Sequence, residues 1–557
     1  MSPGKLAELL AVLVLGTLAA ASAILLLRAV RSGEKPRMAL AALLAVLCVD
    51  ALWVWPEGLR AEHFPLLFAR LAAPVPALLA ARTQSDRALR WCGYLVAALG
   101  AALVALSLVR IHPNIGNVDF FCFVCTARDL LDGASAELQK NLVYFPGVYL
   151  FWMAALTATA RALSGLQWWV ASVLLLDALL CALVVRRGTR STPLALIAGC
   201  LELLVSFNVE GPRGTAEPLA TIFFLAGAAG WAGLPLRGAA WRGLLLGAGL
   251  GAAIYCKQTA GLLSLGWLAL WLSQEEDGPA SFTVPAGAVL GLALLFVLHG
   301  GVPALRAGLG LASAYPRVGE FLPNFRGFML GVNPLVPLAL LCGAVWLLGR
   351  KHRREPALRL AGFLLIGSAA ALYQFRTRDY PHYGLLALPG LLAGCTLIGH
   401  FFWTRIPEAY APARRAGLAA LLTLSLGKLC STSLRYVETL HDWPYGFAAE
   451  AQLPTLGVKP GEQGFVMPPQ RSAVHFLLGT RSAGWKHSYY WGAAVPGDAL
   501  LAVQSPAVKF VVVRQGKWDR MDNQICRDSG CAEAIAALPT AGFHLAAQTG
   551  DVELWRR

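Results

Sequence analysis

Residues 119–133 read DFFCFVCTARDLLDG and follow a long apolar run at 91–109, WCGYLVAALGAALVALSLV, that has no charged side chain. A helix that spans a bilayer needs about 20 mostly apolar residues. Three other stretches also meet this requirement without a charge, at 9–27, 283–298 and 327–349. The sequence therefore predicts an α-helical polytopic membrane protein in which the segment around Asp119 is a polar loop.

Composition supports this fold class. Of the 557 residues, 57% are hydrophobic and 14% are charged, whereas about 25% are charged in an ordinary soluble protein. The net charge of +15 is spread over short loops and does not gather in a basic domain, so nucleic acid is not an expected partner. The first apolar segment is long and has no convincing cleavage site, which favours a retained helix over a signal peptide.

The distribution of Lys and Arg predicts the orientation, because loops that stay in the cytoplasm are enriched in these residues. With the N-terminus outside, about 14 spans fit one alternating path. They are expected at 6–28, 38–56, 64–82, 91–111, 167–185, 193–208, 216–234, 242–257, 259–273, 282–299, 328–349, 358–374, 381–403 and 416–434. The first outer loop, 112–147, and the polar C-terminal segment then lie on the same extracytoplasmic side.

One apolar segment, 148–162, does not fit this alternating path. If it crossed the bilayer, every later loop would move to the opposite side of the membrane. Its flanks contain aromatic and basic residues such as Trp152 and Arg161. These are typical of a helix that lies in the membrane interface. We therefore expect a juxtamembrane helix here.

The C-terminal segment is less hydropathic and has short β-rich runs at 464–467, 509–514 and 552–555, with a helical stretch at 531–538. This pattern predicts a small α/β extracytoplasmic domain. The expected organisation is N-terminal extra spans at 1–90, a transmembrane catalytic module at 91–434 and the α/β domain at 435–557. Outside the cytoplasm a disulfide is permitted, and Cys526–Cys531 is favoured over Cys122–Cys125.

The Asp119 loop resembles a known family. Asp119-Phe120, an aromatic residue four positions after the Asp, Arg128, Gly133 and then Tyr-Phe-Pro at 144–146 are similar to the first outer loop of GT-C glycosyltransferases. The likeness is greatest to the polyprenyl-phosphate-sugar-dependent, mannosyltransferase-like group. The resemblance implies that Asp119 is the general base and that juxtamembrane helices follow the first core span. Without it, an acid in the first turn of a helix is explained equally well by the macrodipole.

Cations at the outer ends of spans are candidates for binding the phosphate of a lipid carrier. Lys257, in YCKQTAG, is similar to the family's lysine that contacts this phosphate, although a snorkelling lysine is the alternative. Arg376, Arg378 and His382 precede a run similar to a late Tyr-and-Pro-bearing helix of the family. An Arg pair beside Asp379 could equally form a solvated ion pair.

Three further acids and one arginine complete the candidates. Glu217, which starts a span with Pro218, is assigned a substrate or helix-capping role, and Arg128 joins the substrate-binding set. Asp177 and Glu202 lie inside spans, where a partner in the bundle explains them as well as function does, so neither enters the predicted site.

A tightly bound metal is not predicted, because Asp119 is followed by two phenylalanines where metal-using relatives have paired acids; a divalent cation stays an open alternative.

The resemblance implies an inverting glycosyltransferase. It would move a hexosyl or pentosyl group from a polyprenyl-phosphate monosaccharide to a glycan, lipid or protein acceptor at the outer face of the cytoplasmic membrane, in the cell envelope. The Ala-, Leu-, Gly- and Arg-rich composition suggests a bacterial source. The alternative is a transporter or flippase for a lipid-linked anion, which would distribute cations through the depth of the bundle. An O-antigen polymerase or ligase would place its large loop later in the chain.

Overall fold

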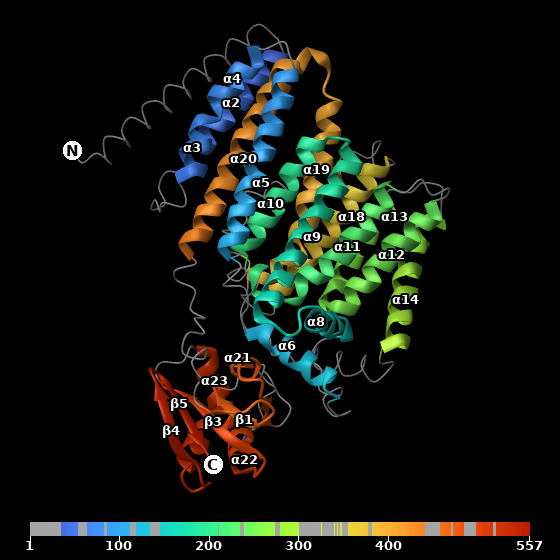
Figure 1. Ribbon diagram of the computed structural model, residues 1–557. Helices are drawn as coiled ribbons and strands as arrows, with labels where there is room; N and C mark the ends of the chain where they lie inside the picture. Colours follow the sequence, from blue (N-terminus) through green and yellow to red (C-terminus); the bar gives the residue numbers. More distant parts are fainter. Residues whose placement is uncertain are drawn as a thin grey trace, which may run out of the picture.

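The computed structural model shows a helical bundle with a small sheet domain at one end (Figure 1). It describes residues 35–53, 64–82, 86–111, 118–133, 145–209, 211–233, 239–272, 279–299, 355–376, 381–439, 457–468, 472–483, 497–515 and 520–557, with a few positions between 325 and 347.

The bundle consists of α-helices joined by short 3₁₀ segments. Its α-helices are α2 (Lys35–Trp53), α3 (Phe64–Ala72), α4 (Pro74–Arg82), α5 (Asp86–Ile111), α9 (Leu163–Thr189), α10 (Thr192–Asn208), α11 (Ala216–Gly233), α12 (Ala239–Cys256), α13 (Trp267–Leu272), α14 (Pro279–His299), α18 (Pro356–Ala371), α19 (Leu388–Thr404) and α20 (Ala411–Thr439). Helical segments stand at every expected span that the described residues cover. The expected span at 6–28 and most of the one at 328–349 lie outside them.

Four of these helical segments are long and apolar enough to cross a membrane, which supports an integral membrane protein. They are Asp86–Arg110, Leu163–Thr189, Pro356–Arg376 and Glu408–Leu434. The other apolar helices in the described residues are too short to meet the same requirement of length and apolar composition. The expected number of about 14 spans therefore stays a prediction.

Glycines let the shorter helices approach closely. A Cβ on Gly247 would clash with the carbonyl oxygen of Val284, and one on Gly287 would clash with that of Leu244. Backbone contact of this kind is typical of helix packing in membranes, where small residues line the interface. It fixes α12 against α14.

Two short helices, α6 (Val118–Leu131) and α8 (Pro146–Ala158), lie across the end of the bundle that faces the sheet domain (Figure 1). Phe120 packs edge-to-face on Trp152 with ring centroids 5.2 Å apart, which joins the two helices. Asp119 is in the first turn of α6, and Gly133 follows the helix with φ +79°. Helices are thus present at both expected positions, and α8 lies across the end of the bundle (Figure 1); their location in the membrane interface stays a prediction.

The C-terminal domain has a five-stranded sheet in the order β2-β1-β3-β5-β4. Its strands are β1 (Gln463–Met467), β2 (Arg481–Ser482), β3 (Val508–Arg514), β4 (His544–Thr549) and β5 (Val552–Arg556), and its helices are α21 (Ser472–Leu477), α22 (Asp498–Gln504), α23 (Arg520–Ser529) and α24 (Cys531–Ala537). β1 pairs in parallel with β2 and β3, whereas β5 runs antiparallel to β3 and β4. The predicted α/β class is confirmed; β2 and β4 were not predicted.

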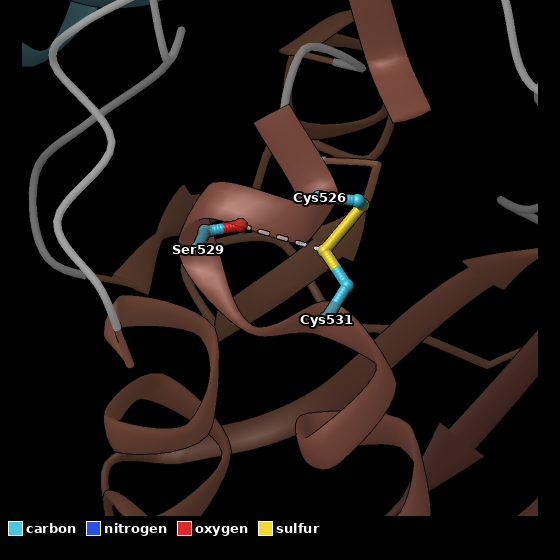
Figure 2. The surroundings of a disulfide bond; sticks show 3 residues. All are labelled: Cys526, Ser529 and Cys531. Atoms are coloured by element: carbon cyan, nitrogen blue, oxygen red, sulfur yellow. Dashed lines mark hydrogen bonds between the residues drawn. A yellow bond between two sulfur atoms is a disulfide. The ribbon is translucent and has the colours of Figure 1, made fainter. Parts of the chain in front are cut away.

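A disulfide joins Cys526 at the end of α23 to Cys531 at the start of α24, with Ser529 beside the bridge (Figure 2). Cys122 and Cys125 are buried in α6 as free thiols. The disulfide is therefore formed by Cys526 and Cys531, as expected, and Cys122 and Cys125 are not bridged.

Candidate functional site

Lys257 stands where the backbone leaves one helix and enters another. α12 ends at Cys256, Lys257 is extended at φ −144° and ψ 114°, and the 3₁₀ helix η4 (Gln258–Gly266) follows. The Lys257 backbone N–H still donates to the Ala253 carbonyl at 2.9 Å. The side chain is only 6% exposed. A cation this deeply buried needs a counter-charge.

Glu217 supplies that charge from the first turn of α11. The distance from Lys257 Nζ to Glu217 Oε1 is 2.7 Å, and the Glu217 side chain is fully buried. Its Oε2 has no hydrogen-bond partner among the described residues. The carboxylate also complements the N-terminal end of the α11 macrodipole. The two residues that the sequence proposed separately therefore form one buried ion pair.

His382 and Tyr383 close this group from a third segment, the 3₁₀ helix η7 (Pro381–Leu386). The Tyr383 ring centroid is 5.4 Å from Lys257 Nζ, and the His382 and Tyr383 rings are 4.8 Å apart. His382 is 5% exposed and acts electrostatically on Glu217. We call Glu217, Lys257, His382 and Tyr383 the Lys257 cluster.

The two transverse helices contact the segments next to this cluster. A Cβ on Gly147, in the first turn of α8, would be 2.7 Å from the Tyr255 carbonyl oxygen, two residues before Lys257. A Cβ on Gly214 would be 2.8 Å from the Phe120 ring, so α6 touches the segment that leads into Glu217. Gly214 has φ +71°, a conformation that glycine adopts at little cost.

Asp119 precedes Phe120 in α6, so its backbone lies at this contact. The position of its carboxylate lies outside the described part of the structure, as does Arg378. Arg376 ends the 3₁₀ helix η6 (Leu372–Arg376), is exposed, and stacks over the Tyr373 ring at 5.6 Å. The structure thus brings together Glu217, Lys257 and His382, whereas Arg376 is not placed in their group.

Arg128 joins α6 to the C-terminal domain, and its predicted substrate contact stays a prediction. Its guanidinium donates to the carbonyl oxygens of His475 at 2.9 Å and Thr480 at 2.6 Å, both in the C-terminal domain, and pairs with Asp129 at 3.3 Å. Phe121 packs on Phe476 beside these bonds, with ring centroids 5.8 Å apart. Arg128 therefore anchors the C-terminal domain on α6. The sequence spacing from Asp119 to Arg128 did not predict this contact between Arg128 and the C-terminal domain.

The intramembrane acids have hydroxyl partners. Thr221 donates to Asp177 Oδ2 at 2.6 Å, and Ser206 donates to Glu202 Oε1 at 2.7 Å. One carboxylate oxygen of each acid thus accepts a hydrogen bond from a hydroxyl inside the bundle. Among the described residues, no group of three or more His, Cys, Asp or Glu side chains is arranged to hold a metal ion.

Comparison with known proteins gives a likeness of fold. No protein-family model and no curated protein matches the chain. The crystal structure of ArnT from Cupriavidus metallidurans bound to undecaprenyl phosphate matches with a TM-score of 0.51 and 14% identity, over 83% of this chain and 97% of that chain. The apo state of the same protein matches with a TM-score of 0.47 and 15% identity, over 82% and 97%. The expected mannosyltransferase-like subgroup gains no support. The chain is thus similar in fold to ArnT.

Proposed function

We propose that this protein transfers a sugar from a polyprenyl-phosphate monosaccharide to an acceptor hydroxyl at the outer face of a bacterial cytoplasmic membrane. The observation that carries the proposal is the Lys257 cluster, a buried cation at a helix break that packs against α8. The fold supports it, because the ArnT structure with this fold is bound to undecaprenyl phosphate.

The charges fit the departure of a lipid phosphate. An ammonium has three N–H donors, so the bond to Glu217 is compatible with a further contact from Lys257 to a phosphate oxygen. His382 lies within the same cluster, and Arg376 and Arg378 stay further candidates for a contact with this phosphate. Fixed cations lower the barrier by stabilising charge that develops as the phosphate leaves.

Asp119 would act as the general base. Its carboxylate takes the proton of the acceptor hydroxyl as that oxygen bonds to the anomeric carbon. The bond from this carbon to the phosphate oxygen breaks, and its electron pair leaves with the phosphate. One displacement inverts the anomeric configuration. A protonated acid is not needed, because a phosphate leaves as a stable anion.

Two features support an outer-face site. The Arg-rich segments around Arg87, Arg187 and Arg414 lie at the bundle end opposite to α6 and the C-terminal domain (Figure 1), which is the pattern of cytoplasmic loops. The Cys526–Cys531 disulfide lies in the C-terminal domain, and such bonds persist in oxidising compartments.

Asp119→Asn tests the mechanism. Membranes that contain the variant, supplied with radiolabelled polyprenyl-phosphate sugars, should lose transfer by at least about 100-fold, the usual contribution of a general base, and should still bind donor. The matched control is Asp132→Asn, an acid one residue past the end of the same helix, which is partly exposed and paired with Arg161 at 2.6 Å. Normal transfer by Asp119→Asn would reject the assignment. Parallel assays with a chelator test the divalent cation.

A further inference from the structure

A second candidate site lies at the end of the bundle away from the C-terminal domain. A cavity of about 500 Å³ opens between the first turns of α5, α10 and α20 and the last turn of α19. This volume is within the range of roughly 300–1,000 Å³ that is typical of small-molecule sites. The Lys257 cluster is formed by other segments, so this cavity is separate from the proposed active site.

The mouth of the cavity is basic. Arg90, Arg414 and Arg415 line it together with one acid, Asp86. Asp86 is 3.6 Å from Arg414 and 3.9 Å from Arg415, and Glu408 is 3.5 Å from Arg414, so two carboxylates stand against three guanidinium groups. Arg415 is 13% exposed, and its Nε has no hydrogen-bond partner among the described residues. A buried donor without a partner indicates that an acceptor belongs here.

The helix ends add to the positive potential. α5, α10 and α20 all begin beside the cavity, and helix N-termini favour anions. Ser191, the residue before α10, lines the cavity and makes no side-chain capping bond.

The deeper wall is apolar. Leu194, Ile197, Leu418 and Leu422, which follow the first turns of α10 and α20, line it together with Leu89. Both α5 and α20 belong to the segments long enough to span a membrane, so this wall extends toward the bilayer interior. A cationic mouth above an apolar wall matches a molecule with an anionic head and a hydrocarbon chain, whereas a soluble anion would leave the apolar wall unused.

We propose that this cavity binds the phosphate headgroup of an anionic membrane lipid from the leaflet at the end of the bundle away from the C-terminal domain. Arg414 and Arg415 hold the phosphate, Arg90 closes the mouth, and the hydrocarbon chain lies along the leucine-rich wall. The proposal rests on the cavity alone and is independent of the glycosyltransferase assignment.

The experiment uses Trp403, which lines the cavity, as the reporter. Purified full-length protein in detergent is titrated with phosphatidylglycerol whose acyl chains are brominated, and tryptophan quenching is compared with that of Trp403→Phe. The difference should saturate with brominated phosphatidylglycerol and be much weaker with brominated phosphatidylcholine. Arg415→Gln should weaken binding about tenfold, as expected for one charge-assisted hydrogen bond, and Arg415→Lys should lose less.

Arg186→Gln is the matched control, because Arg186 is an exposed arginine at the same end of the bundle and does not line the cavity. It should bind like the unaltered protein. Equal quenching by both lipids, or equal affinity of Arg415→Gln and Arg186→Gln, would overturn the proposal. Binding of inorganic phosphate without any Trp403-dependent quenching by lipid would also overturn it, because it would assign the cavity to a soluble anion.

Discussion

The ion pair between Lys257 and Glu217 allows a structural role to be separated from a role in binding the carrier phosphate. The side chains are 6% and 0% exposed and their charged atoms are 2.7 Å apart. Removing one partner leaves the other charge buried, which costs about 3–5 kcal/mol. Lys257→Met and Glu217→Gln should therefore both lower the thermal unfolding midpoint of the purified protein and both lose transfer.

The double variant Lys257→Met/Glu217→Leu separates the two roles. It removes both charges and replaces them with apolar side chains, a change that is often neutral or stabilising. Its unfolding midpoint should thus return close to that of the unaltered protein. If Lys257 contacts the carrier phosphate, however, transfer should stay at the level of the single Lys257 variant.

The assay pairs thermal unfolding in detergent with transfer from radiolabelled donor in reconstituted membranes. Arg161→Gln is the control, since Arg161 pairs with Asp132 at a site where the side chains are 47% and 32% exposed. Loss of that pair should cost at most about 1 kcal/mol. Recovery of both stability and transfer in the double variant would show that the pair only supports the fold, and would refute the phosphate-binding role of Lys257.

Three further changes test the surroundings of the site. Arg128→Gln should weaken the docking of the C-terminal domain by about 3 kcal/mol, because it removes two charge-assisted bonds to carbonyls, and hydrogen exchange in α21 should rise. Gly147→Val should destabilise the protein by about 1–3 kcal/mol through overpacking against the end of α12, whereas Gly261→Ala, where a Cβ meets nothing within 4 Å, should melt normally. Reduction of Cys526–Cys531 should cost the C-terminal domain about 2 kcal/mol through loop-closure entropy, measured by calorimetry; a Cys526→Ala/Cys531→Ala variant should not respond to reductant.

The sequence predicted the fold well where one local rule was sufficient. Apolar length and composition located the helices, and alternating charge placed the segment 148–162 across the bundle, where α8 is found. The short β-rich runs gave three of the strands. β2 was missed because two residues carry no pattern, and β4 because its side chains, in HLAAQT, are mostly exposed or half-buried and lack alternation.

The site was predicted only as separate residues. Lys257 and Glu217 are 40 positions apart, and no periodicity relates them to His382. Their meeting depends on tertiary packing, since α11, the end of α12 and η7 converge at one point. For the same reason the partner of Arg128 could not be foreseen: the accepting groups are backbone carbonyls more than 300 residues later, and every residue has such a carbonyl.

The contacts of α6 relate the C-terminal domain to the proposed chemistry. Asp119 and Arg128 are nine residues apart on this helix, a rise of about 14 Å, so the helix spans from the contact with Gly214 to the contact with the C-terminal domain. A helix of this length moves as a stiff unit between its two contacts. The C-terminal domain therefore cannot shift without either breaking the bonds of Arg128 or displacing Phe120 and its neighbour Asp119. We infer that this domain holds the backbone of Asp119, the proposed general base, in position through α6.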